Sequence, residues 1–249
     1  GGRQRRLSAI HCAARSEPLY LANTAVSGAC GVALLLAWRR DHAQSFLRMV
    51  GLAFALHALL APTYALMRSS APPLSQIALA VLLLVATLSA GLILMGVAYL
   101  ADRPVPRRAQ RLGLLALVVG AAALMPLGEP RALVVPALLN LLLGLAALTM
   151  LWRRGGAERL SGMLLVLLAL NANQLFVFGP DVADRQVVIG MVLRLGIALA
   201  LLQAAGLRSS EASHVARERF ARLTAHSHQG IAVVRGEQLL YANPALLRI

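Results

Sequence analysis

The chain has 249 residues, of which 59% are hydrophobic and 14% are charged. Its apolar residues gather in runs near the ~20 residues that cross a bilayer core, a pattern that excludes a soluble globular domain. The net charge of +14 would suit nucleic acid only if the basic residues shared one soluble surface. They lie between the apolar runs instead, so no nucleic-acid partner is expected.

Seven apolar stretches follow a short N-terminal tail at residues 1–17. Most are near the ~20 residues that a membrane-spanning helix needs, and the fourth is the shortest. The stretches lie at 18–38, 47–67, 74–100, 112–127, 132–152, 160–179 and 186–207. The sequence therefore predicts an all-α membrane bundle of seven transmembrane helices over residues 18–207, with the lipid bilayer as its surroundings.

The arginines are divided unevenly between the loops. The first, third and fifth loops hold ten arginines, whereas the second, fourth and sixth hold three. Because basic residues resist translocation, the arginine-rich loops mark the cytoplasmic side. This predicts an N-terminus outside and a cytoplasmic C-terminus. The arginines of the N-terminal tail argue the other way, and we give the six loops more weight.

The segment after the last apolar stretch has a different character. Residues 208–226 are polar and predict a connector helix that carries Val215, Phe220 and Leu223 near helical spacing. Two short β-type runs follow at 230–234 and 238–242, and the three residues between them contain a glycine, which predicts a hairpin.

Asn243-Pro244 closes the second run and predicts the start of a helix, because proline suits a first helical position. The helix followed by GIAVVRGEQLLYANPALLRI resembles the opening of a PAS domain. The resemblance covers about 35 residues, whereas a domain of typical size has ~100. It implies an incomplete α+β PAS domain at 227–249, and leaves open whether the domain holds haem, flavin or nothing.

The membrane part resembles, in its architecture, the seven-helix sensory regions that precede PAS domains in diguanylate cyclases, cyclic di-GMP phosphodiesterases and sensor histidine kinases. This resemblance implies the bacterial inner membrane, a homodimer, and an output domain beyond residue 249. Cyclic di-GMP synthesis or hydrolysis is the first choice for that output, and histidine kinase activity is the alternative. No catalytic motif of these classes occurs in the sequence, so no catalytic site is assigned.

Polar side chains inside the apolar stretches indicate where a signal could bind, because they are costly in a membrane and usually face the bundle interior. Four of them lie about 8 to 10 residues from the predicted outer face, or ~12 to 15 Å at helical rise. We expect a pocket open to the periplasm, in which Arg194 pairs with an anionic ligand or headgroup. The candidate ligand-binding residues are Arg194, His57, Asn171, Asn140, Asn173, Gln174 and Asn23.

Other readings of these residues stay open. Asparagine and glutamine in membrane helices often bond a neighbouring helix as packing contacts. No acidic residue lies within an apolar stretch to neutralise Arg194, and His57 has no second membrane histidine with which to hold a metal or haem. A transporter or channel also needs buried polar groups at mid-depth, so it remains the alternative from another functional class.

Overall fold

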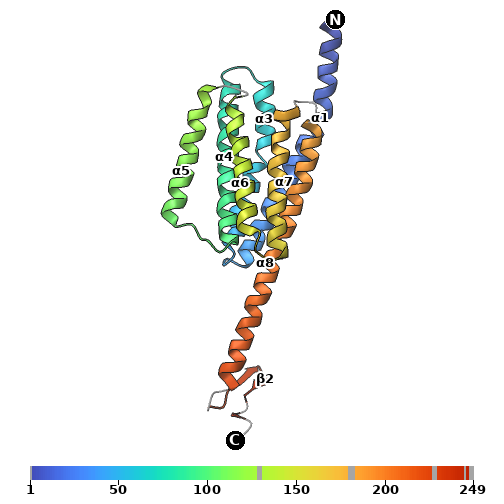
Figure 1. Ribbon diagram of the computed structural model, residues 1–249. Helices are drawn as coiled ribbons and strands as arrows, with labels where there is room; N and C mark the ends of the chain where they lie inside the picture. The colour runs from blue at the N-terminus through green and yellow to red at the C-terminus, as the bar shows by residue number, and fades with distance from the viewer. Residues whose placement is uncertain (1, 128–130, 179–182, 226–228, 244, 247–249) are drawn as a thin grey trace. The chain divides into compact units, whose positions relative to one another are not determined.

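The computed structural model describes residues 2–127, 131–178, 183–225, 229–243 and 245–246. They divide into two compact units, Gly1–Gln203 and Ala204–Ile249. Helices and one short 3-10 turn make up the first unit (Figure 1). In chain order they are α1 (Gly2–Arg40), α2 (Ser45–His57), α3 (Leu60–Ser69), α4 (Leu74–Leu100), α5 (Arg107–Leu124), η1 (Met125–Leu127), α6 (Arg131–Leu151), α7 (Gly156–Phe178) and α8 (Ala183–Ala225).

The described part of the chain contains five segments long and apolar enough to cross a membrane. They are Pro18–Arg40, Ser45–Met67, Leu74–Leu100, Val134–Leu151 and Asp184–Thr224. This confirms a helical protein with several candidate membrane spans. The two further crossings stay a prediction: α5 begins with three arginines in its first five residues, and α7 carries charged residues near its start and three side-chain amides near its end.

The second predicted span is interrupted. Helix α2 ends at His57 and α3 begins at Leu60, while Leu59 keeps helical angles (φ −81°, ψ −15°). Pro62 accounts for the interruption, because it has no N–H to bond the carbonyl of Ala58.

Small residues bring α1 and α2 into close contact. A Cβ added at Gly31 of α1 would lie 2.8 Å from the backbone nitrogen of Ala55 and 2.9 Å from the carbonyl oxygen of Gly51. Gly51 and Ala55 are four residues apart and therefore share one face of α2. Small residues at these positions let the two helix backbones touch. Inside a membrane, the van der Waals contact between them stabilises helix association, because lipid provides no hydrophobic driving force.

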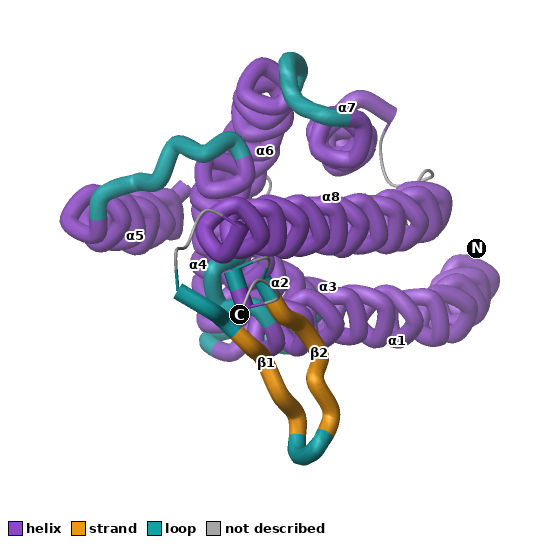
Figure 2. Tube along the Cα trace, turned by 90° about the horizontal axis from the view of Figure 1, so that it is seen from below, coloured by secondary structure: helices purple, strands orange, loops and turns teal. Residues whose placement is uncertain are grey.

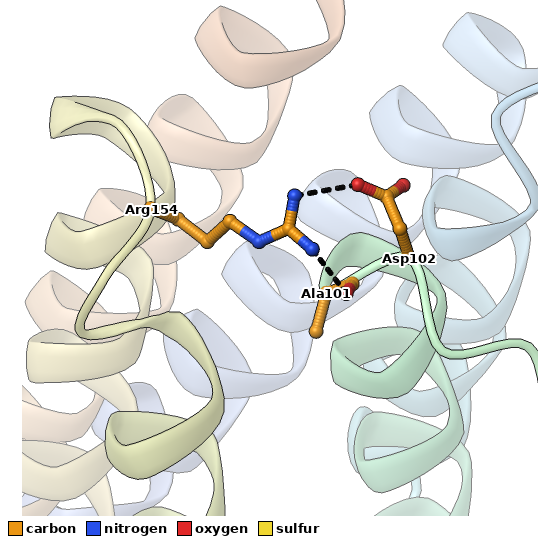
Figure 3. Close-up of polar contacts among 3 residues, drawn as sticks. All are labelled: Ala101, Asp102 and Arg154. Carbon is orange, nitrogen blue, oxygen red and sulfur yellow. Dashed lines mark hydrogen bonds and ion pairs between the residues drawn. The ribbon is translucent and has the colours of Figure 1, made fainter.

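The three arginine-rich loops lie at the same end of the bundle (Figure 1). At this end Arg154, between α6 and α7, reaches across to the end of α4 (Figure 3). Its Nη1 donates to the Asp102 carboxylate at 2.6 Å, and its Nη2 donates to the carbonyl oxygen of Ala101. Asp102 adopts a positive φ of 54°, which turns the chain out of α4. One arginine therefore pairs with an acid and caps a helix C-terminus.

The second unit holds the end of α8 and a hairpin. Strands β1 (Ala232–Arg235) and β2 (Gln238–Ala242) pair antiparallel, with an irregularity between Val233 and Val234. Gly236 in the turn has a φ of +60°, a conformation that glycine adopts without strain. The predicted hairpin is confirmed, and its first strand begins two residues later and ends one residue later than predicted. A PAS domain is not evident, and the predicted helix start at 243–244 lies largely outside the described residues.

Candidate functional site

The most deeply buried charge that the structure describes within a candidate span is the guanidinium of Arg194, whose residue is only 5% exposed. Its Nε donates to the carbonyl oxygen of Gly190, one turn earlier in α8, at 3.0 Å. Its Nη1 donates to Ser27 Oγ at 3.2 Å, and its Nη2 donates to Asn23 Oδ1 at 2.8 Å. Arg194 thus joins α8 to α1.

The two acceptors on α1 lie on one helix face. Asn23 and Ser27 are four residues apart, which places their side chains one above the other. Both are buried, and Ser27 has no exposed surface. The helix therefore presents an amide and a hydroxyl together to the guanidinium.

Helix α7 approaches the same place through Asn171. Its Nδ2 donates to the carbonyl oxygen of Gln186 at 2.9 Å, and Gln186 Nε2 donates to the carbonyl oxygen of Ala172 at 3.1 Å, so the two amides tie α7 to α8 reciprocally. A Cβ added at Gly190 would lie 2.8 Å from Arg194 Nη2 and 3.3 Å from Asn171 Nδ2. Arg194 and Asn171 therefore flank the same glycine.

Two features of this cluster favour binding. Arg194 has five N–H groups, and three of them donate to neutral oxygens, so two have no acceptor within the described part of the chain. Asn171 Oδ1 is buried there without a donor. The cluster offers a cation, amides and a hydroxyl, which suit an anionic or polar group.

The structure separates the other predicted residues from this cluster. Asn173 Nδ2 donates to the carbonyl oxygens of Ala169 at 2.8 Å and Ala137 at 3.2 Å, which makes it a packing contact between α7 and α6. Asn140 and Gln174 are half-buried, and no polar contact links either of them to Arg194 among the residues described. Of the seven candidates, Arg194, Asn23 and Asn171 lie together, whereas among the described residues no hydrogen bond joins the half-buried His57 to them.

Three members of the cluster were missed by the sequence prediction: Ser27, Gln186 and Gly190. Two of them had a signal in the sequence. Ser27 follows Asn23 by four residues, the spacing at which side chains on one helix meet. Gly190 precedes Arg194 by four, which brings its carbonyl oxygen within reach of the arginine side chain. Gln186 had none, because its partner lies on another helix.

A second polar junction lies wholly within the second unit and centres on Asn243, which has no exposed surface. Its Nδ2 donates to the carbonyl oxygens of Thr224 in α8 and of Gln229, at 3.0 and 2.9 Å. Its Oδ1 accepts from the backbone N–H groups of Ile231 and Leu246 at 2.8 and 3.0 Å. All four hydrogen-bonding positions of one amide are thus used: the bond to Thr224 joins it to the end of α8, and the other three hold the residues that flank the hairpin.

Aromatic residues support the same junction. Tyr241 of β2 shares a hydrogen bond of 2.7 Å with the Thr224 hydroxyl, and its ring lies 5.9 Å from that of Phe220, centroid to centroid. The hairpin is therefore fixed to the last two turns of α8 by both polar and apolar contacts.

Comparison of the chain with models of protein families, with curated proteins and with solved structures found no match.

Proposed function

We propose that this protein is a transmembrane signal-sensing module, in which a periplasmic or membrane signal acts at Arg194 and is carried by α8 toward a cytoplasmic PAS-type segment. The observation that supports this most directly is that one helix contains both junctions. Helix α8 carries Arg194, which is bonded to α1, and Thr224, which is bonded to Asn243.

The chemistry of the signal follows from the Arg194 cluster. An anionic group would satisfy the two N–H groups of the guanidinium that have no acceptor, and would compensate a charge that is costly inside a membrane. A ligand changes the conformation only if it binds one arrangement of α1 and α8 better than the other. An anion that competes with Asn23 for the guanidinium of Arg194 would bind better to the arrangement in which the Asn23–Arg194 bond is broken.

The topology and output in this proposal are those that the sequence predicts: seven spans, an outer N-terminus, a bacterial inner membrane, and a homodimer with a cytoplasmic output. Cyclic di-GMP synthesis or hydrolysis is the first choice, on the resemblance to PAS-containing receptors alone. Autophosphorylation on histidine is the alternative.

The test uses protein expressed from the complete coding sequence and purified in lipid. Cyclic di-GMP synthesis, its hydrolysis and autophosphorylation are measured for the wild type, for Arg194→Gln, and for a matched control, Arg185→Gln. The control removes an exposed charge from the first turn of the same helix. We expect nucleotide turnover that changes in Arg194→Gln and not in the control. Phosphorylation without nucleotide turnover would favour the kinase, and an output equal in all three proteins would refute the role of Arg194.

A transporter or channel is the second candidate, because it also needs buried polar groups inside the membrane, and Arg194 and Asn171 are such groups. The two readings differ in what crosses the membrane. Flux of an anion into liposomes that contain the purified protein, abolished by Arg194→Gln, would favour transport over sensing.

A further inference from the structure

Helix α5 has two contrasting faces. It lies at the margin of the bundle, beside α4 (Figure 2). One face packs inward, where Ala121 joins Leu83 of α4 and Ala132 of α6 in a buried cluster. Ala121 is the one residue of α5 that is buried. The opposite face of α5 is therefore exposed at the surface of the bundle.

The opposite face carries charge at its start and apolar side chains beyond it. Arg108 is followed on this face by Arg111, Leu112, Leu115 and Val119, at offsets of three, four, seven and eleven residues. These offsets keep all five side chains on one side of a helix. Leu112, Leu115 and Val119 are 66%, 59% and 60% exposed. Two cations and an apolar strip thus follow one another along the helix.

The arginines of this segment have no acidic partners among the described residues. Arg103, Arg107, Arg108 and Arg111 are all exposed. Asp102 is the one acidic residue between positions 101 and 124, and it is bonded to Arg154. The segment therefore keeps an uncompensated positive charge.

The start of α5, which carries these arginines, is held in place. Gln110 Nε2 donates to the carbonyl oxygen of Val105 at 2.7 Å and to the Tyr99 hydroxyl at 2.6 Å. These bonds fix the first turn of α5 to the end of α4. Because Gln110 faces α4, Arg108, two residues earlier, points away from the bundle, and Arg111 points to the side; both are exposed.

We infer that this face of α5 is a binding site for an anionic phospholipid, whose phosphate lies between Arg108 and Arg111 and whose acyl chain lies along Leu112, Leu115 and Val119. A phosphate suits two neighbouring guanidinium groups, because it can accept charge-assisted hydrogen bonds from both. An acyl chain fits the apolar strip, because Leu112 to Val119 spans about 10 Å at helical rise, within the ~15 Å of one leaflet of a bilayer core. This site does not depend on the sensory function proposed above.

The experiment titrates the full chain in detergent with phosphatidylglycerol or phosphatidylcholine and counts retained lipids by native mass spectrometry. We expect selective retention of phosphatidylglycerol. Replacing both arginines (Arg108→Gln with Arg111→Gln) should weaken this binding about 10- to 30-fold, since each arginine near a charged headgroup contributes roughly a factor of five.

The matched control is Arg39→Gln with Arg40→Gln, which removes the same charge at the same end of the bundle from two exposed arginines. Binding of the control should stay within about 3-fold of wild type, as expected for screened, non-contacting charges. An equal loss in both pairs would overturn the site in favour of a general charge effect, and equal retention of the two lipids would also overturn it.

Two further measurements test whether the site binds free phosphate or a second copy of the chain instead of a lipid. Leu115→Asn should weaken phosphatidylglycerol binding, and the water-soluble headgroup without acyl chains should fail to compete. If the headgroup competes as well as the lipid, the site binds phosphate and the lipid proposal is wrong. A dimer mass that disappears in Leu115→Asn would assign this face to a second copy of the chain. Equal thermal unfolding midpoints establish that all variants are folded.

Discussion

Asn23 Oδ1 accepts a hydrogen bond of 2.8 Å from Arg194 Nη2, and this bond joins the first and last helices of the membrane unit across 171 positions of the chain. A guanidinium in a low-dielectric interior attracts an amide oxygen more strongly than it would in water. The bond is therefore a suitable place to ask how strongly α1 and α8 depend on one another.

We expect a measurable coupling between these two residues. In a double-mutant cycle of Asn23→Ala and Arg194→Gln, the interaction energy should be about 0.6 to 1.7 kcal/mol, between the average and the largest value for hydrogen bonds inside a membrane protein. It is measured from unfolding in denaturing detergent. The control pairs Arg194→Gln with Asn140→Ala, because Asn140 makes no polar contact with the site among the described residues. Coupling no larger than in the control pair would contradict the assignment.

The crossing of α1 and α2 should not tolerate a methyl group. Gly31→Ala places a Cβ within 2.9 Å of backbone atoms of Gly51 and Ala55, and backbone cannot rotate away as a side chain can. We expect a destabilisation of about 1–3 kcal/mol, as for other overpacked sites.

The control for this crossing is Gly120→Ala in α5, where an added Cβ meets nothing within 4 Å. It should be neutral or stabilise the protein by up to about 1 kcal/mol, because alanine has the higher helix propensity. Both variants are compared by thermal unfolding. Equal midpoints would show that the two helices separate easily.

The Asn243 junction should fail when its amide is removed. Asn243→Ala deletes four hydrogen bonds and leaves the N–H of Ile231 and the carbonyl of Thr224 without partners. Each unsatisfied buried group costs about 1–3 kcal/mol, so the hairpin should detach from α8. Hydrogen exchange should accelerate at the amides of Ile231 and Leu246. Glu237→Gln, in the exposed turn, should leave exchange unchanged, and similar protection in both variants would argue against the junction.

The bond between Arg154 and Asp102 should contribute little to stability. Their side chains are 36% and 58% exposed, so solvent screens the pair and the expected loss in Asp102→Asn is below about 1 kcal/mol. The loss should shrink further in high salt. Arg154→Gln should cost more, because it also removes the donor to the carbonyl of Ala101. Thermal unfolding at low and high salt tests both statements, and a salt-independent loss in Asp102→Asn would contradict the surface character of the pair.

The sequence by itself determined the properties that depend on local pattern. Runs of apolar residues near bilayer length predict helices, and the structure has helices along all seven stretches, with five segments that meet the criteria for spans. The hairpin at 232–242 followed from two β-type runs and a glycine-containing turn. These features need only neighbouring residues, because backbone hydrogen bonds form within a helix or across a short turn.

Tertiary structure decided which polar residues meet. Asn171, Asn173 and Gln174 are neighbours in the sequence, yet Asn171 lies beside Arg194 while Asn173 faces α6, because residues two apart point to different sides of a helix. Gln186 and Ser27 entered the cluster through helices that the sequence does not place side by side. The outward face of α5 is likewise defined by the tertiary structure, because the opposite face packs on α4. Such pairings depend on how the helices cross. The crossing is set by side-chain packing between segments that are distant in the sequence.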